Sequence, residues 1–356
     1  MSKIKLGVIF GGVSTESDLS VWSIQNVLSE LDKEKYEIFP IYIGKNRKWY
    51  KFLETKKIEL GEEIKNKEEI TNVFKYLEDL DVIFPGLSGI NGEDGSIQGL
   101  LELINKPYVG CGILGSGLGL DKAYTKIIFE KAGLKQAKYE YIRKYKEKYF
   151  YVDKEFNQEL LDIDDILVKI KKNLKFPLFV KPSNSGSSFG ITKVIQEEKL
   201  KSAIEYASKF DSKIVIEEGI DGREVECAVF GNEEVIASGV GEIKFTADFY
   251  TYSAKFVNAE KNEIKADISK ELTEKIRAQA IKAFKAIDGR GLSRVDFFIE
   301  NKTNEIIINE INTMPGFTKN SMYPKLFEEY GICLKDLLDK IINLAFENHK
   351  SKNYKF

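Results

Sequence analysis

The chain has 356 residues, more than one ordinary hydrophobic core organises, so we expect two or three domains. Hydrophobic residues make up 43% of the chain and charged residues 31%, which is typical of a globular protein in water. The net charge of −2 supplies no positive field for nucleic acid. No apolar run reaches the roughly 20 residues that span a bilayer. We therefore expect neither a nucleic-acid nor a membrane partner.

The single histidine and the three cysteines limit the possible chemistry. His349 lies in a polar stretch near the end of the chain, which excludes a His general base, a Ser-His-Asp triad and a His-rich zinc site. Cys111, Cys227 and Cys333 are scattered and form no CxxC pair, which indicates reduced thiols and a cytoplasmic protein. Carboxylates, lysines, arginines, hydroxyls and hard metal ions remain as the reactive groups.

The first part of the chain has the pattern of a parallel α/β domain, which we end at residue 122. Its predicted elements are a strand at 4–10, a helix at 16–31 and further strands at 37–43 and 81–86. The Gly-rich stretches at 11–12 and 115–119 do not match GxGxxG, and we interpret both as tight turns.

The rest of the chain mixes helices and strands in an α+β pattern, which we divide into units at 123–215 and 216–356. Predicted in the first unit are a helix at 122–132, strands at 139–143, 176–182 and 190–195, and a helix at 197–209. Predicted in the second are strands at 223–231, 234–241, 292–300 and 305–311, a long loop at 243–265, and helices at 269–287 and 334–346.

Polar residues within two apolar strands predict a metal site. Side chains two apart in a strand share a face, so a hairpin of 292–300 and 305–311 would bring Asp296, Glu310 and Asn312 together. Ionised carboxylates in strands this apolar cost several kcal/mol unless a cation or an ion pair compensates them. Three oxygen ligands suit Mg²⁺. The alternative is a structural ion pair of Arg294 with Asp296 or Glu310.

The segment 181–190, KPSNSGSSFG, is a candidate phosphate-binding loop. Its small residues allow backbone N–H groups and hydroxyls to approach a phosphate, and Lys181 adds positive charge. It is not a Walker A loop, and an ordinary hairpin turn would look similar. The oxygen-ligand metal site downstream favours nucleotide binding.

Taken in order, seven segments resemble the D-alanine–D-alanine ligases of the ATP-grasp superfamily, over about residues 4–345. These segments are GGVSTESDLS at 11–20, GEDGSIQG at 92–99, LDKAYTK at 120–126, KPSNSGSSFG at 181–190, FYTYSAKF at 249–256, RVDFFIE at 294–300 and NEINTMPGFTKNSMYP at 309–324. The resemblance implies an ATP-grasp fold, a cytoplasmic homodimer, and synthesis of the peptidoglycan precursor D-alanyl-D-alanine from ATP through an acylphosphate.

The resemblance also implies a role for each matched residue. Glu16 and Ser187 would meet the ammonium of the first D-alanine, and Arg294 and the Gly316 N–H would stabilise the oxyanion. Ser321, Met322 and Phe256 would line the acceptor site. The residues implied for the nucleotide and its ions are Lys122, Lys181 and Lys255 on the phosphates, Glu217 and Glu224 at the adenine and ribose, and Asp296, Glu310 and Asn312 on two Mg²⁺ ions, with Mn²⁺ as a substitute. A mobile loop at 243–265 would close over the acylphosphate.

Three positions depart from the family pattern. Phe256 replaces a tyrosine whose hydroxyl joins the residues matching Glu16 and Ser187 in many members. Ligases with Phe at this place make D-alanyl-D-lactate, so D-lactate is a candidate acceptor beside D-alanine and D-serine. Ser88 stands where the family usually has His, and Ser17 stands where it often has His or Arg. These losses make the substrate pocket less cationic.

Two other readings stay open. The chain could be another ATP-grasp ligase for amino acids or a dipeptide, although FYTYSAKF and NTMPGFT belong to the D-alanine ligase pattern. It could instead be a non-catalytic nucleotide sensor. The intact metal ligands and phosphate lysines disfavour a sensor.

Overall fold

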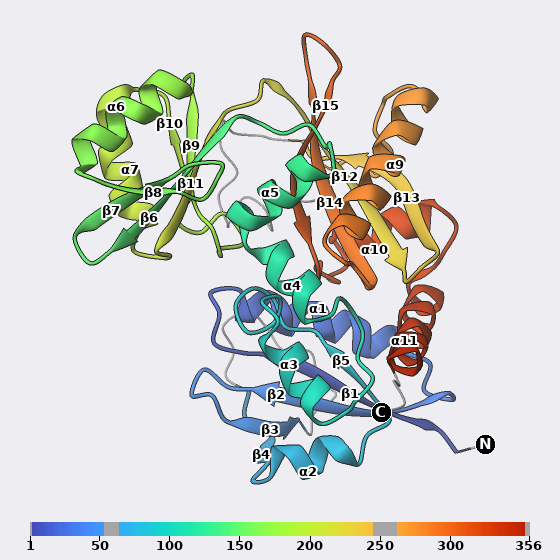
Figure 1. Ribbon diagram of the computed structural model, residues 1–356. Helices are drawn as coiled ribbons and strands as arrows, with labels where there is room; N and C mark the ends of the chain where they lie inside the picture. Colours follow the sequence, from blue (N-terminus) through green and yellow to red (C-terminus); the bar gives the residue numbers. More distant parts are fainter. Residues whose placement is uncertain (1, 53–63, 245–261, 353–356) are drawn as a thin grey trace.

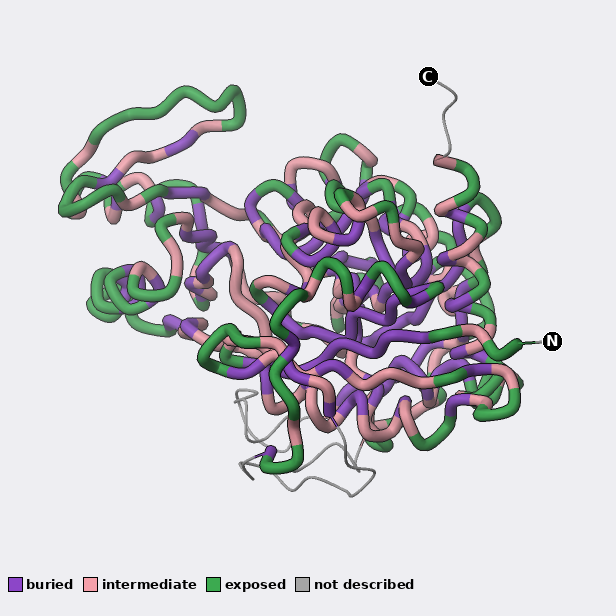
Figure 2. The backbone as a smooth tube through the Cα atoms, turned by 90° about the horizontal axis from the view of Figure 1, so that it is seen from below, coloured by how far each residue is buried: buried purple, intermediate pink, exposed green. Residues whose placement is uncertain are grey.

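The computed structural model describes residues 2–52, 64–244 and 262–352, and within these ranges the chain forms three β-sheets with helices packed on them (Figure 1). Buried residues follow the strands through the interior, and exposed residues follow the helix surfaces and turns (Figure 2). In the described part of the chain, no helix is long and apolar enough to cross a membrane.

The first sheet has the order β4-β3-β2-β1-β5, and its centre confirms the predicted parallel domain. Its strands are β1 (Ile4–Gly11), β2 (Tyr36–Ile43), β3 (Trp49–Phe52), β4 (Lys67–Glu69) and β5 (Val82–Pro85). β1 pairs in parallel with β2 and β5, whereas β3 and β4 continue the sheet in antiparallel pairing. β1 lies between β2 and β5, and β5 is the last strand of the sheet. Both strands are apolar because helices cover their two faces.

Alternating side chains of β1 enter two different cores. Leu6, Val8 and Phe10 join the core beneath α1 and α11, whereas Ile9 joins the core beneath α2 and α3. The four helices are α1 (Ser17–Glu30), α2 (Val73–Glu78), α3 (Ser96–Leu103) and α11 (Leu334–Ser351). The N-terminal sheet is therefore completed by a helix from the far end of the sequence.

The second sheet is antiparallel, with the order β10-β9-β11-β6-β7-β8. Its strands are β6 (Tyr139–Tyr145), β7 (Lys148–Val152), β8 (Gln158–Leu161), β9 (Leu178–Pro182), β10 (Thr192–Val194) and β11 (Lys213–Glu218). α6 (Ile163–Asn173) and α7 (Leu200–Ala207) bury apolar residues on one face. Against Tyr141 and Val215 lies Ala123 of α5 (Lys122–Lys131).

The third sheet is also antiparallel, with the order β13-β12-β14-β15. Its strands are β12 (Gly222–Gly231), β13 (Val235–Glu242), β14 (Gly291–Glu300) and β15 (Ile306–Asn312). α9 (Lys270–Ala286) covers one face, and α10 (Met322–Glu329) packs on β12 and β13. β14 and β15 pair directly, which confirms the predicted hairpin.

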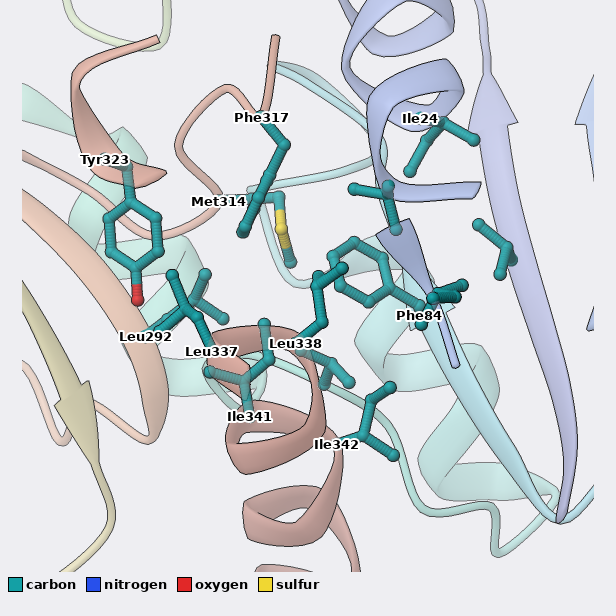
Figure 3. Close-up of a cluster of buried hydrophobic side chains, with 14 of the residues drawn as sticks. Ile24, Phe84, Leu292, Met314, Phe317, Tyr323, Leu337, Leu338, Ile341 and Ile342 are labelled. Atoms are coloured by element: carbon teal, nitrogen blue, oxygen red, sulfur yellow. The ribbon is translucent and has the colours of Figure 1, made fainter. Parts of the chain in front are cut away.

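One hydrophobic cluster joins the first and third sheets. Figure 3 shows Phe84 of β5 and Ile24 of α1 on one side and Leu292 of β14 on the other. Between them lie Met314, Phe317 and side chains of α11. Burial of a side chain of this size contributes about 1.5–3 kcal/mol. The loop after β15 is thus anchored by its apolar side chains.

Several features of the described chain differ from expectation, among them the helices α2, α3, α6 and α10, which were not predicted. Residues 115–119 are not a tight turn but part of α4 (Ile113–Leu120), because Gly119 lets the helix approach Thr313 closely, where a side chain would clash. The strands β3, β4, β7 and β8 were not predicted, because each is only three to five residues long and so carries few alternations.

We propose one adjustment to the domain boundaries expected at 122 and 215. The first coincides with the start of α5. The second falls inside β11, whose residues pair with β6 and β9 throughout, so we place it at 219–221. α11 contributes to the core of the first sheet although it belongs to the last unit in sequence.

Candidate active site

Glu16 lies at the start of α1, enclosed by two glycines from other parts of the chain. It is buried, and Ser187 donates a hydrogen bond to its carboxylate. Side chains at Gly89 and Gly186 would clash with the Glu16 carboxylate. Gly89 also has a φ of +70°, which favours glycine. The predicted pair of Glu16 and Ser187 therefore meets where the first domain touches the phosphate-loop candidate.

A second acid, Glu93, lies beside Glu16. Its Oε1 accepts a hydrogen bond from the Gly89 N–H at 2.9 Å, and its Oε2 accepts one from the Met314 N–H at 3.1 Å. Burial, followed by the negative charge of Glu16, raises the pKa of Glu93 to about 8. The substrate end of the site thus holds two neighbouring carboxyl groups.

Three charged side chains meet at the other end of the site. Lys126 and Lys181 both pair with Glu217, and the Lys126 Nζ to Glu217 Oε2 distance is 2.7 Å. Burial alone would raise the pKa of Glu217, but the two ammonium groups outweigh it and lower the pKa to about 2. Burial lowers the pKa of Lys126, whereas Glu217 outweighs burial at Lys181 and raises its pKa.

The phosphate-loop candidate is fastened to the first turn of α5. The Ser183 hydroxyl donates to Asp121 at 2.5 Å and accepts from the Ala123 N–H at 2.9 Å. Asp121 also pairs with Lys213. Ser187 and Ser188 have φ values of +48° and +61°. The segment joins the antiparallel strands β9 and β10, so the hairpin connection is present, and its phosphate-binding role stays a prediction.

Lys122 connects the phosphate-loop candidate to the metal-ligand candidates. Its Nζ donates to the Ser185 carbonyl at 2.6 Å and lies 3.4 Å from Glu310 Oε2. Because the Lys122 side chain is largely buried, this bridge lies inside the protein. The phosphate-loop candidate and the metal-ligand candidates, which are distant in sequence, therefore both contact the Lys122 ammonium group.

The hairpin brings the three metal-ligand candidates together. Asp296 lies directly opposite Glu310 in the β14–β15 register, and Asn312 donates to Asp296 Oδ2 at 3.1 Å. Arg294 also bonds Asp296 through Nε and Nη2, each at 2.7 Å, so the alternative ion pair is present as well. On β12, Glu226 lies opposite Asp296 and 3.1 Å from Arg294 Nε.

These contacts favour the charged form of Arg294. Burial alone would lower the pKa of Arg294, but Asp296 and Glu226 outweigh it and raise the pKa well above its usual value. In the described ranges, no three side chains of the types His, Cys, Asp and Glu are arranged to hold a metal ion. The candidate set has two carboxylates and one amide, all of them oxygen donors that suit Mg²⁺.

The loop after β15 is held by the first domain. The Phe317 N–H donates to Ser23 at 3.1 Å, and the Asn26 amide donates to the Phe317 carbonyl at 2.8 Å. Ser321 lies directly before α10, and its Oγ accepts from the Thr318 N–H at 3.0 Å. Gly316 lies within this loop, so α1 positions it. Met322 points its side chain into the hydrophobic cluster.

A cavity lies between the second and third sheets next to the lysine cluster. It is lined by Lys126, Ala137, Phe179, Lys181, 217–220, Phe298 and 307–309. Apolar and aromatic side chains form its walls, while Lys126, Lys181 and Glu217 form a charged end. Glu224 and Glu310 add to the negative potential that favours the charged form of Lys181.

Some of the predicted site residues lie outside the described part of the chain. The structure also places residues in the site that were not predicted. Lys255, Phe256 and most of the predicted loop 243–265 fall in 245–261, which is not described. Glu93 and Lys126 lie in quoted motifs but had no assigned role. Glu226 alternates with apolar residues along β12, as Asp296 does along β14, and that pattern could have indicated it.

These features define a class of protein. An antiparallel sheet on each side of a cavity, with lysines on one and paired carboxylates on the other, is the ATP-grasp arrangement of a nucleotide-dependent ligase. The family model described as D-ala D-ala ligase N-terminus matches residues 5–111, and the one described as D-ala D-ala ligase C-terminus matches 128–343. The chain therefore belongs to the D-alanine–D-alanine ligase family.

Individual relatives agree with this assignment. D-alanine–D-alanine ligases of Thermoanaerobacter sp. (strain X514) and Ruminiclostridium cellulolyticum are 45% and 44% identical. The first match covers 99% of each chain, and the second covers 98% of this chain and 97% of the relative.

Solved structures show the same fold. The D-alanine-D-alanine ligase from Coxiella burnetii has a TM-score of 0.82 at 30% identity, covering 99% of this chain and 96% of that one. The VanG D-Ala:D-Ser ligase from Enterococcus faecalis has a TM-score of 0.81 at 34% identity, covering 97% and 100%. The ligase from Bacillus anthracis complexed with ATP has a TM-score of 0.75 at 28% identity, covering 98% and 100%.

Proposed function

We propose that the chain is an ATP-dependent ligase that joins two D-alanine molecules into the dipeptide used for peptidoglycan. Family membership over nearly the whole chain supports this function. The observation that carries it in the structure is the bridge of Lys122 between the Ser185 carbonyl and Glu310. That bridge brings a phosphate-loop candidate and a metal-ligand candidate into one site.

ATP would lie between the second and third sheets. Phe179, Ile220 and Phe298 give the cavity an apolar wall for adenine, and Glu217 lines the same cavity. With Glu217, Glu224 is the proposed contact for the adenine and ribose. The phosphates would follow the loop 181–190, where small residues allow close approach. Lys122, Lys181 and Lys255 are the proposed phosphate contacts. Lys126 is added to them because it pairs with the same carboxylate, Glu217, as Lys181 does. Lys122, Lys126 and Lys181 would exchange their protein partners for phosphate oxygens.

Asp296, Glu310 and Asn312 fit two Mg²⁺ ions, for which Mn²⁺ could substitute. All three present oxygen atoms, and two are carboxylates at opposed positions on the hairpin. Bound Mg²⁺ would neutralise negative charge on the phosphates during phosphoryl transfer. Arg294 already compensates Asp296, so the residues can hold their arrangement before an ion binds.

The remaining residues would orient the two amino acids. Glu16 and Ser187 would hold the ammonium of the first D-alanine, whose carboxylate oxygen attacks the γ-phosphorus and releases ADP. The amine of the second D-alanine, after losing a proton to solvent, attacks the acyl carbon, and the C–O bond to phosphate breaks. Arg294 and the Gly316 N–H would stabilise the oxyanion. Ser321 and Met322 would form the acceptor site.

D-Lactate is a second candidate acceptor, because Phe256 has no hydroxyl. The Glu16–Ser187 hydrogen bond is present, but a phenylalanine cannot extend it as tyrosine does. A lactate hydroxyl carries no ammonium proton to lose, so its use as acceptor should increase relative to D-alanine at acid pH. D-Serine is a third candidate, consistent with the 34% identity to the D-Ala:D-Ser ligase.

A homodimer completes the proposal. Leu103 of α3 and Ile113 and Leu114 of α4 are exposed apolar residues that a partner subunit could cover. Light scattering of the purified protein would give the mass of the assembly, and a monomeric mass at micromolar concentration would contradict the dimer.

Phosphate release with ATP, Mg²⁺ and D-alanine, with products separated by mass, tests the function. We expect D-alanyl-D-alanine and one phosphate for each dipeptide. Addition of D-lactate across about two pH units tests the acceptor. Dipeptide alone at every pH would contradict the lactate proposal, and absence of phosphate release with all three acceptors would contradict the ligase.

A further inference from the structure

We propose that Glu93 is a positioning residue that fixes the distance between the two amino-acid subsites. This inference rests on the proposed function. The Glu93 carboxyl group forms a bridge, because it accepts hydrogen bonds from two backbone N–H groups, which lie in loops that follow strands of two different sheets. Gly89 follows β5 of the first sheet, and Met314 follows β15 of the third.

Each end of the bridge lies next to one subsite. Gly89 encloses the Glu16 carboxylate so closely that a side chain there would clash with it. Met314 lies two residues after Asn312 and two before Gly316. The bonds at 2.9 and 3.1 Å therefore connect the ammonium-binding end to the oxyanion end through a single side chain.

Packing makes this bridge effective. The side chains of Met314 and Phe317 point into the hydrophobic cluster, so the loop after β15 presents its backbone toward the first domain (Figure 3). Ser23 and Asn26 hold that loop at Phe317, further along the chain. Because α1 begins beside Glu16, those bonds also join the two ends, and Glu93 adds a second connection that acts at Met314, closer to Asn312. A displacement of about 1 Å in a reacting group can cost about 100-fold in rate, so this span matters for catalysis.

The neighbouring acid provides a matched control. Asp94 also accepts two backbone N–H bonds, from Asn91 and Ser96, each at 2.9 Å. Asn91 lies in the same loop, and Ser96 is the first residue of α3, directly after that loop. Asp94→Asn therefore removes the same kind of acceptor as Glu93→Gln, but it does not disturb a connection between sheets.

The test compares Glu93→Gln and Asp94→Asn with the wild-type protein in the phosphate-release assay. A glutamine amide can accept at its oxygen but not at its nitrogen, so one of the two bridged N–H groups loses its acceptor. We expect kcat/KM for D-alanine to fall about 10- to 100-fold in Glu93→Gln, with a higher KM for D-alanine and a KM for ATP within about twofold of wild type. Asp94→Asn should stay within about threefold on every constant.

Two comparisons separate positioning from a merely structural role. A loss of stability alone would reduce the active fraction and kcat while leaving KM for D-alanine unchanged, and that outcome would overturn the inference. Glu93→Asp keeps the carboxyl group but is shorter by one methylene, so it should also raise KM for D-alanine. Wild-type values in Glu93→Gln, or equal effects in Glu93→Gln and Asp94→Asn, would overturn the inference while leaving the ligase intact. A wild-type protein that forms no product would overturn the proposed function, and the inference with it.

Discussion

The buried carboxyl groups at the nucleotide end and at the amino-acid end of the site have opposite electrostatic surroundings. At the first, Glu217 lies between Lys126 and Lys181, and its pKa is lowered to about 2. At the second, Glu16 and Glu93 lie together, and the pKa of Glu93 is raised to about 8. The nucleotide end carries its own counter-ions, whereas the amino-acid end has an excess of negative charge that suits an incoming ammonium group. Affinity for a cationic substrate is thus built into the unliganded protein.

Removing the central carboxylate of the nucleotide end should have the largest effect on stability. Glu217→Gln leaves two buried ammonium groups without their partner, which costs about 3–5 kcal/mol in the free energy of unfolding. Urea denaturation measures it. Glu218→Gln is the control, because within the described residues the Glu218 side chain accepts one hydrogen bond, from the Lys175 N–H, and glutamine can still accept it. Equal stabilities of the two variants would contradict the compensated cluster.

Neutralising the amino-acid end should act on binding rather than on folding. Glu16→Gln removes the charge that meets the ammonium, and a hydrogen bond to a charged group contributes about 1.5–3 kcal/mol. We therefore expect kcat/KM for D-alanine to fall about 10- to 150-fold while KM for ATP stays unchanged. The same substitution should lower the pKa of Glu93, because the charge of Glu16 helps to raise it. An unchanged kcat/KM would show that the ammonium binds elsewhere.

The two ends should also respond to pH with opposite signs. Both carboxyl groups start from an ordinary pKa of 4.5. The stability that Glu217 contributes is present above pH 4.5 and is lost as the pH falls toward 2. The contribution of Glu93 is complete below pH 4.5 and is lost as the pH rises to 8. Unfolding free energies of wild type and Glu93→Gln between pH 5 and 9 should therefore converge at acid pH and diverge toward 8. Parallel curves would contradict the raised pKa.

The smallest expected signal is a proton released when D-alanine binds. At pH 7 Glu93 is largely protonated, and an ammonium group on Glu16 cancels the charge that keeps it so, while Arg294 already favours its ionised form. Up to one proton should leave for each bound D-alanine. Titration calorimetry in buffers of different ionisation enthalpy measures this number, and Glu93→Gln should reduce it to zero. Equal release in both proteins would assign the proton to another group.

Structural features that depend on a single segment of the sequence could be predicted, whereas contacts between distant segments could not. The parallel sheet and the β14–β15 hairpin follow from alternation within single segments, and both predictions are confirmed. The association of Asp296 with Asn312 followed from the hairpin alone. Glu93 and Lys126 could not be assigned in the same way, because their partners Met314 and Glu217 are set by packing between sheets. The helix at 113–120 was missed because close contact, rather than propensity, explains its glycines.

The docking of α11 has a consequence for the order of folding during synthesis. Leu337, Leu338 and Ile341 cover the face of the first sheet formed by Val82 and Phe84 of β5, which are translated long before them. Domains generally fold from the N-terminus as the chain emerges from the ribosome. This sheet cannot bury that face in the native way until α11 has left the exit tunnel. The nascent first domain therefore exposes an apolar surface for most of translation, which makes it a natural site for a chaperone to bind.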